Sequence, residues 1–117
     1  MEASRERMLR KEICAVGKRL WGKGMFSANS GNISARLGPE EVLITPTLVS
    51  KGFMSPRQIL VLDLEGRVLR GEGHPSTETP VHLGIYRESE KIGAVVHAHP
   101  PAATAFAVAE NGNLLTE

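Results

Sequence analysis

Residues 92–101 have the sequence IGAVVHAHPP, an apolar run that ends in two histidines and two prolines. A β-strand sends alternate side chains to the same face, so His97 and His99 in a strand would project together, about 7 Å apart along the chain. Two imidazoles placed that way can hold one metal ion. Because proline cannot continue a strand ladder, we expect the pair at the end of a buried strand. The alternative is that one or both histidines only pack or hydrogen-bond locally.

Apolar periodicity in the rest of the chain predicts an alternation of helices and strands. Apolar residues spaced three and four apart are typical of an amphipathic helix, here over residues 4–21. The other expected elements are strands at 33–37, 42–45, 59–64 and 67–70, a short helix after Ser55, and helices at 79–90 and 102–109. A site at the edge between the 92–99 strand and the following helix would match the usual position of ligand sites in α/β proteins.

The composition is typical of one globular domain and excludes several classes of protein. The 14 Lys and Arg residues nearly balance 13 Asp and Glu residues, and no segment concentrates positive charge, which argues against a nucleic-acid partner. The sequence has no apolar run of membrane-spanning length and no signal-peptide core. Cys14 is the single cysteine, so no intrachain disulfide can form. We therefore expect a cytoplasmic protein in which Cys14 is buried and inert.

A second candidate region, GHPSTE at residues 73–78, precedes the helix expected at 79–90. The hydroxyls of Ser76 and Thr77, with free backbone N–H groups at a helix start, can bind an anion. Helix capping alone would also explain both residues. Glu78 has two interpretations as well: a favourable charge at the helix dipole, or a carboxylate beside a metal that acts as ligand or as general acid and base.

Three further features need weighing in the same way. The segment Ser30-Gly31-Asn32 is a turn by default, and a backbone approach to phosphate if other parts of the site agree. His82 lies among apolar helix residues, so we expect a hydrogen-bonded core histidine there rather than a metal ligand. His74 lies in a loop and is assigned no role.

Four segments occur in a specific order: SGNIS at 30–34, LITPT at 43–47, HPSTETPVHLGIYR at 74–87 and IGAVVHAHPPAATAFA at 92–107. In this order they resemble the class II aldolase and adducin head family, over residues 24–109. The resemblance implies an α/β fold, a three-layer α/β/α sandwich around a central, mainly antiparallel sheet. It also implies that residues 1–117 form one domain of this type, incomplete at its C-terminus.

The resemblance assigns roles residue by residue. The zinc ligands of the family match His97 and His99, and its catalytic carboxylate matches Glu78, which can also approach the metal when substrate is absent. The residues that match the family's phosphate site are Gly31, Asn32, Thr47, Leu48, Ser76 and Thr77. Leu48 stands where the family usually has glycine, so we expect it to resist a positive φ and to crowd the anion.

The function that the resemblance implies is a zinc-dependent aldolase. It would cleave a phosphorylated ketose, similar to fuculose 1-phosphate, to dihydroxyacetone phosphate and an aldehyde. Zn²⁺ polarises a carbonyl and stabilises the negative charge that develops when the carbon–carbon bond breaks. Glu78 would move the proton at that carbon. The expected partner is thus a phosphorylated sugar.

Two alternatives stay open. A sugar-phosphate 4-epimerase of the same family would break the same kind of bond and re-form it on the other face. Epimerases of the family tend to carry aspartate at the position of Glu78, so the glutamate favours an aldolase. The second alternative is a non-catalytic, adducin-like binding or oligomerisation domain. Such a domain would normally have lost the metal histidines, and this chain keeps both.

Members of the family also draw a third zinc histidine and further active-site groups from a C-terminal segment, and they form homotetramers. The sequence ends at Glu117, before either of these groups. We therefore expect a fragment of a longer enzyme that forms homo-oligomers, binds zinc more weakly than a three-histidine site would, and has little activity as given.

Overall fold

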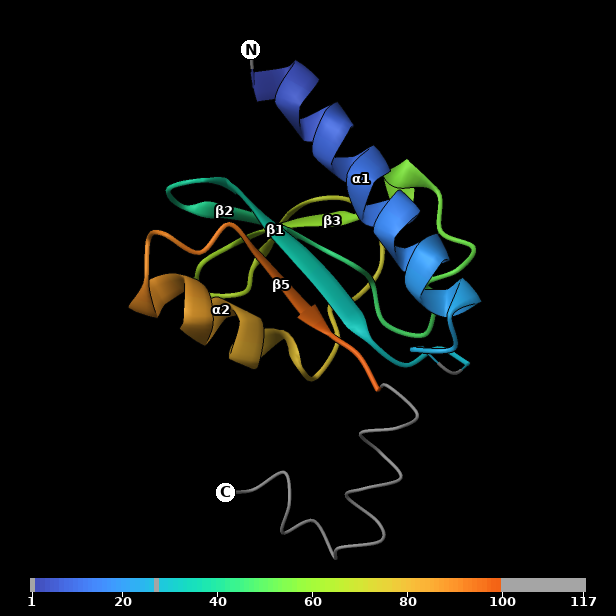
Figure 1. Ribbon diagram of the computed structural model, residues 1–117. Coiled ribbons are helices and arrows are strands. Elements are labelled where there is room, and N and C mark those ends of the chain that lie inside the picture. Colours follow the sequence, from blue (N-terminus) through green and yellow to red (C-terminus); the bar gives the residue numbers. More distant parts are fainter. Residues whose placement is uncertain (1, 27, 100–117) are drawn as a thin grey trace, which may run out of the picture.

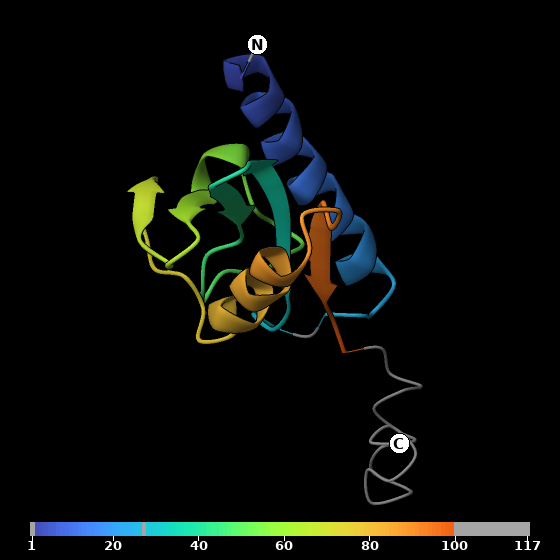
Figure 2. The same ribbon diagram turned by 90° about the vertical axis from the view of Figure 1, so that its left-hand side faces the viewer.

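The computed structural model describes residues 2–26 and 28–99, which form a single antiparallel sheet between two helices (Figures 1 and 2). The strand order is β4-β3-β2-β1-β5, and every neighbouring pair is antiparallel. The elements in chain order are α1 (Glu2–Gly22), β1 (Asn32–Gly38), β2 (Glu41–Ile44), the 3₁₀ turn η1 (Pro56–Gln58), β3 (Leu60–Asp63), β4 (Val68–Arg70), α2 (Thr79–Glu88) and β5 (Ala94–His97). The expected three-layer α/β/α arrangement is confirmed.

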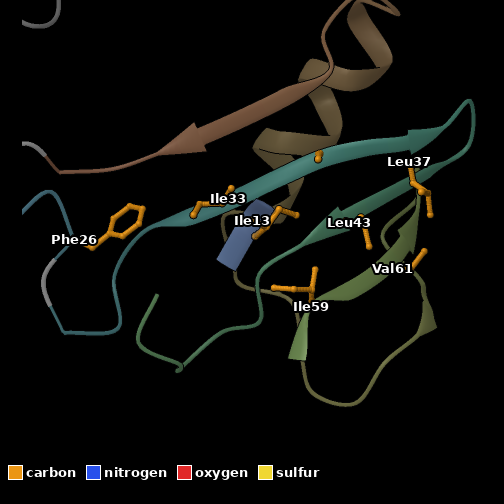
Figure 3. Close-up of a cluster of buried hydrophobic side chains, with 8 residues drawn as sticks. Ile13, Phe26, Ile33, Leu37, Leu43, Ile59 and Val61 are labelled. Atoms are coloured by element: carbon orange, nitrogen blue, oxygen red, sulfur yellow. The ribbon is translucent and has the colours of Figure 1, made fainter. Parts of the chain in front are cut away.

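The alternation of side chains along the strands produces buried hydrophobic clusters on both faces of the sheet. On one face of the sheet, Ile13 of α1 packs against a cluster of buried strand residues, among them Ile33, Leu43 and Val61 (Figure 3). On the other face, Leu83 and Tyr86 of α2 pack against Val42 of β2. Because successive strand residues face opposite layers, one sheet serves both helices.

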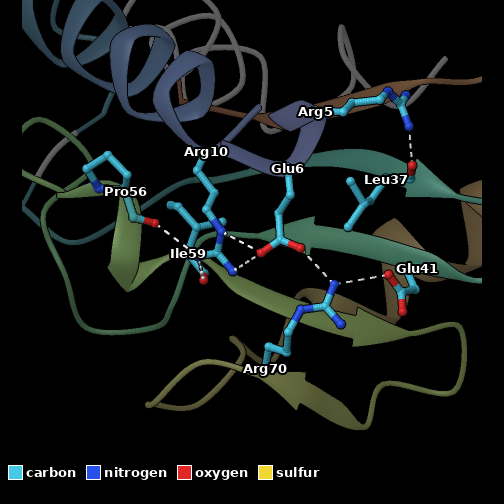
Figure 4. A network of polar contacts seen from close by, with 8 residues as sticks. All are labelled: Arg5, Glu6, Arg10, Leu37, Glu41, Pro56, Ile59 and Arg70. Carbon is cyan, nitrogen blue, oxygen red and sulfur yellow. Dashed lines mark hydrogen bonds and ion pairs between the residues drawn. The ribbon is translucent and has the colours of Figure 1, made fainter. Parts of the chain in front are cut away.

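A polar network fastens the N-terminal half of α1 to the sheet (Figure 4). Glu6 accepts hydrogen bonds from Arg10, one turn along the helix, and from Arg70 of β4. Arg10 also donates to the carbonyl oxygens of Pro56 and Ile59. Although burial raises the pKa of Glu6, the hydrogen bonds from Arg70 and Arg10 hold it below its ordinary value of 4.5. No helix in the described ranges is long and apolar enough to cross a membrane.

On the opposite face, Arg36 of β1 fixes the end of α2. Its guanidinium donates to the carbonyl oxygens of Tyr86, Ser89 and Ile92 at 2.8–3.0 Å, and its Cζ lies 5.0 Å from the centre of the Tyr86 ring. Unpaired carbonyls at a helix end need such partners. Arg36 therefore closes α2 and positions the turn that leads into β5.

The strand that carries the histidines differs from the expectation. It forms the edge of the sheet among the described residues, pairs with β1 alone and is partly exposed, with Val96 48% accessible. It also ends at His97, so His99 lies just beyond it. An apolar run predicts a strand, but it does not specify how many neighbours cover that strand. The helix expected at 102–109 lies outside the described residues.

Candidate functional site

A hollow of about 200 Å³ lies where four segments of the chain meet. It is lined by Asn29, Ser30, Gly31, Asn32, Thr47, Lys51, Ser76, Glu78, His97 and His99. The structure thus brings together most of the residues that the sequence singled out, from the turn before β1, the loop after β2, the start of α2 and the end of β5. Leu48 and Thr77 are not part of its lining, and Lys51 is an addition that the sequence did not suggest.

Backbone pairing explains why these segments converge. Ile33 donates its N–H to Thr45 Oγ1 at 3.1 Å and accepts a bond from the Thr45 N–H at 3.0 Å, which continues the β1–β2 pairing. The Thr47 N–H then donates to the His74 carbonyl at 2.9 Å, and Pro46 forms an isolated bridge with Pro75. These contacts place the loop after β2 between the start of β1 and the start of α2.

The turn before β1 requires its glycine. Gly31 has φ of +91°, and a Cβ there would overlap the ring of Phe26 and press on the His97 carbonyl. A side chain at this position would therefore be strained and would separate β1 from β5. The glycine allows the backbone of the turn to lie directly beside the histidine strand.

The rings of His97 and His99 lie next to each other at the C-terminal end of β5. Their centroids are 4.9 Å apart with the planes tilted by 57°. Asn32 pairs with His97 across the β1–β5 ladder, and Asn32 Oδ1 lies 3.3 Å from His97 Nδ1. The His99 N–H donates to the Met25 carbonyl at 2.9 Å, which fixes the backbone after the strand. The pair is consequently held in place by contacts from two other segments.

This arrangement fits the donor set of a divalent metal. A metal-binding imidazole usually donates its second ring N–H to an oxygen partner, which fixes the tautomer. If Nδ1 of His97 carries the proton shared with Asn32, the Nε2 lone pair stays available for a metal. Across residues 2–26 and 28–99, no three His, Cys, Asp or Glu side chains gather as a metal site, so Glu78 does not complete one with the histidine pair in this structure.

Glu78 occupies the N-cap position of α2, but its side chain forms no capping hydrogen bond. The residue has helical dihedrals and is exposed. Instead, Ser76 Oγ accepts the Glu78 N–H at 2.9 Å, and the Thr79 N–H donates to the Ser76 carbonyl. The hydroxyl of Ser76 therefore organises the turn, and the carboxylate of Glu78 is left beside the hollow.

Leu48 and Thr77 occupy other surroundings. Leu48 adopts φ of +61°, the conformation that glycine favours, and its side chain is 79% exposed. The predicted backbone strain is therefore present, but the side chain projects into solvent rather than into the hollow. Thr77 lines a neighbouring hollow together with Pro80, Leu83 and Arg87. Neither Leu48 nor Thr77 therefore lines the hollow that contains Thr47 and Ser76.

The structure confirms that His82 is a core histidine. It is 1% exposed, and Ser34 Oγ lies 2.6 Å from its Nδ1 and 2.7 Å from the Tyr86 hydroxyl. Burial lowers the pKa of His82, with a smaller effect of the same sign from His97. Its Nε2 has no hydrogen-bond partner among the described residues. This buried network fixes α2, and hence Glu78, against β1.

Comparisons with known proteins place the chain in a family. The sequence model of the Class II Aldolase and Adducin N-terminal domain matches residues 11–116. The methylthioribulose-1-phosphate dehydratase of Methylococcus capsulatus is 40% identical over 106 residues, which are 91% of this chain and 52% of that protein. The 3-oxo-tetronate 4-phosphate decarboxylase of Haemophilus influenzae is 35% identical over 105 residues, 89% of this chain and 50% of the other.

A solved structure gives the same result. The L-fuculose-1-phosphate aldolase from Thermus thermophilus superimposes with a TM-score of 0.73 at 34% identity, over 87% of this chain and 51% of that one. The chain spans about half the length of the curated relatives it matches. Since the family model covers nearly the whole sequence, the chain belongs to the class II aldolase and adducin N-terminal domain family.

Proposed function

We propose that this chain carries the metal-binding and phosphate-binding part of a lyase that acts on a phosphorylated ketose. One observation supports this most directly: a histidine pair, a carboxylate and a set of neutral hydrogen-bond donors line the same hollow. The relatives described above are named as a dehydratase, a decarboxylase and an aldolase of phosphorylated sugar compounds. Their names share a phosphorylated substrate and a lyase reaction.

His97 and His99 would hold the metal, which we propose to be Zn²⁺ because imidazole nitrogens are among its preferred ligands. When bound, zinc supplies a Lewis acid that polarises a carbonyl oxygen of the substrate. The contribution of Asn32 is to hold the His97 ring through Nδ1.

Other residues that line the same hollow suit a phosphate group. The backbone N–H groups of the Gly31-Asn32 turn and the hydroxyls of Thr47 and Ser76 are neutral donors that a phosphate can accept from. A ketose anchored there by its phosphate would extend its carbonyl toward the histidines. Glu78 lies beside both groups, where its carboxylate can take the proton from the carbon next to that carbonyl.

Dehydration is the reaction we favour, because curated relatives at up to 41% identity are named methylthioribulose-1-phosphate dehydratase. In this reaction the carbon next to the carbonyl loses its proton to Glu78. The hydroxyl on the following carbon then takes up a proton from the carboxylic acid of Glu78 and leaves as water. The carboxylate would thus be regenerated, and the product would be an enol with an intact carbon skeleton. Aldol cleavage is the second candidate, since the Thermus relative is named for it. It would break a carbon–carbon bond and release dihydroxyacetone phosphate and an aldehyde.

Mass spectrometry of the products separates the two reactions. Because little activity is expected of this chain alone, the zinc-loaded chain is used in excess over the substrate, which is methylthioribulose 1-phosphate or, separately, fuculose 1-phosphate. Loss of one water molecule with an intact carbon skeleton supports dehydration, and formation of dihydroxyacetone phosphate supports cleavage. A His97→Ala, His99→Ala double variant should lose zinc, whereas His74→Ala, at an exposed loop histidine, should retain it. Equal zinc content in the double variant and the parent would contradict the metal assignment.

Binding measurements test the phosphate side separately. Calorimetric titration should show that the chain binds the phosphorylated ketose more tightly than the dephosphorylated sugar. Equal affinity for the two would contradict the phosphate site. The homotetramer that the family resemblance implies stays a prediction, which sedimentation of the purified chain can check.

A further inference from the structure

Lys51 is a buried lysine with no acidic partner. Its residue surface is 1% exposed, and Nζ donates to the carbonyl oxygens of Asn29 and Val49 at 2.9 and 2.8 Å. Within the part of the chain that the structure describes, Lys51 takes part in no ion pair. An ammonium group carries three donors, and two neutral carbonyls satisfy two of them without neutralising its charge. Fully buried lysines are rare unless they are paired, so this one needs an explanation.

The position of Lys51 supplies that explanation. The residue lines the hollow that also contains Thr47, Ser76 and the Gly31-Asn32 turn. Asn29, whose carbonyl oxygen Nζ contacts, lines the hollow too, so the ammonium group lies at its wall. Burial lowers the pKa of Lys51, because the charged form is poorly solvated there. An anion in the hollow would provide the counter-charge that the described residues do not.

The backbone of Lys51 packs against helix α1. Gly17 of α1 lies so close that a Cβ there would overlap the Lys51 carbonyl oxygen. The loop that carries Lys51 therefore rests directly on the helix backbone. A cation fixed in this way loses little conformational freedom when a ligand arrives, which favours binding.

We infer that Lys51 provides the positive charge that binds the phosphate group of the substrate in this hollow. The inference rests on the proposed function, because it assumes that the anion is the phosphate of a sugar. The turn, Thr47 and Ser76 offer neutral donors that set the geometry of the phosphate. Lys51 adds the charge that distinguishes a phosphate from a neutral group.

The test is the affinity of the metal-free chain for inorganic phosphate, measured by calorimetry at constant ionic strength. Removing the metal excludes binding of phosphate through zinc. Lys51→Met should weaken phosphate binding by at least about 10-fold, because one partner of a buried charge pair is lost. Lys18→Met makes the same change of net charge at an exposed position of α1 and should leave the affinity unchanged.

A measurement on the unaltered chain keeps the inference testable if Lys51→Met does not fold. The Nζ resonance of each lysine is followed by NMR of the ¹⁵N-labelled chain during titration with phosphate. The resonance of the buried Lys51 ammonium group should shift when it gains a phosphate partner, whereas those of the exposed Lys18 and Lys91 should not. Undiminished affinity in a folded Lys51→Met chain, or a Lys51 resonance that does not shift when phosphate binds, would overturn the role of Lys51 and leave the phosphate site standing. Absence of any phosphate binding would overturn both.

Discussion

Asn32 and His97 face each other across the β1–β5 pair, with Asn32 Oδ1 3.3 Å from His97 Nδ1. If His97 binds a metal as proposed, this contact would make Asn32 a positioning residue for that ligand, in addition to its place in the expected phosphate site. Asn32→Ala should weaken zinc binding by roughly 10- to 100-fold, the usual effect of removing a partner that orients a metal ligand. Competition with a chromophoric chelator measures this affinity.

The matched control for that substitution is Asn29→Ala. Asn29 is exposed, and the contact it makes with Lys51 comes from its backbone carbonyl, which alanine retains. Its zinc affinity should equal that of the parent. If Asn32→Ala also equalled the parent, the Asn32 contact would have no part in metal binding.

Glu78→Gln should leave the free energy of unfolding within about 0.5 kcal/mol of the parent, because the side chain makes no capping hydrogen bond. If Glu78 transfers the substrate proton, the same variant should lower the rate of that step by roughly 10²–10⁴-fold. The measurement is incorporation of deuterium from heavy water at the carbon beside the carbonyl of the bound phosphoketose. Glu88→Gln, also exposed on α2, is the control. A helix-dipole role alone would give the reverse pattern, with a stability loss of about 0.3–1 kcal/mol and an unchanged rate.

The buried His82 predicts a pH dependence of stability in the metal-free chain. Its pKa is lowered from the ordinary value of 6.5, so below that pH the unfolded chain binds a proton that the folded chain refuses. Stability contributed by neutral His82 is therefore complete above pH 6.5 and declines as the pH falls, by at most about 1.4 kcal/mol per pH unit. Urea unfolding between pH 6.5 and about 5.5 measures this slope above the pH range in which Glu6, with an ordinary pKa of 4.5, takes up protons in the unfolded chain.

Substitution of His82 tests whether this residue causes the pH dependence of the free energy of unfolding. His82→Gln should unfold with a shallower pH dependence over this range, although its stability at neutral pH should be lower because the contact with Ser34 is altered. His74→Ala, at an exposed loop position, should retain the slope of the parent. A slope that survived in His82→Gln would assign the pH dependence to another group.

Leu48→Gly should stabilise the chain. A leucine at φ of +61° costs about 1–2 kcal/mol, and the greater freedom of glycine in the unfolded state offsets about 0.4–1 kcal/mol of the relief. We expect a net gain of about 0.5–1 kcal/mol in urea unfolding. Phosphate affinity should not change, because the Leu48 side chain projects into solvent. The control is Leu69→Gly on the exposed strand β4, which should lower the free energy of unfolding. A similar decrease in Leu48→Gly would contradict backbone strain at Leu48.

The helices and inner strands could be predicted because their signals are local. The helix expected at 4–21 is α1, and the strands expected at 33–37 and 42–45 agree with β1 and β2 to within a residue. The helix expected at 79–90 ends earlier, at Glu88, because Arg36 binds the carbonyls at its C-terminus. That contact joins positions 50 residues apart, and no local pattern could indicate it.

The site could be predicted in part for the same reason. The segments that line the hollow were found, because each carries a recognisable motif. The family resemblance predicts Leu48 and Thr77 in the phosphate site together with Thr47 and Ser76. Neither Leu48 nor Thr77 lines the hollow, because a match of motifs fixes the position of a segment and not the surroundings of each of its side chains. The place of Lys51 in the hollow could not be predicted from local sequence, because its ammonium group binds the carbonyl of Asn29, 22 residues away.

The close contact between Gly17 and the Lys51 carbonyl joins the C-terminal half of α1 to the loop that lines the hollow. If a ligand in the hollow restricts that loop, the part of the helix against which the loop packs should open less often. Amide hydrogen exchange in the C-terminal half of α1 should slow when the hollow is occupied, although no residue of that helix lines it. Hydrogen exchange in α1, which packs on the loop that carries Lys51, would then indicate whether ligand is bound.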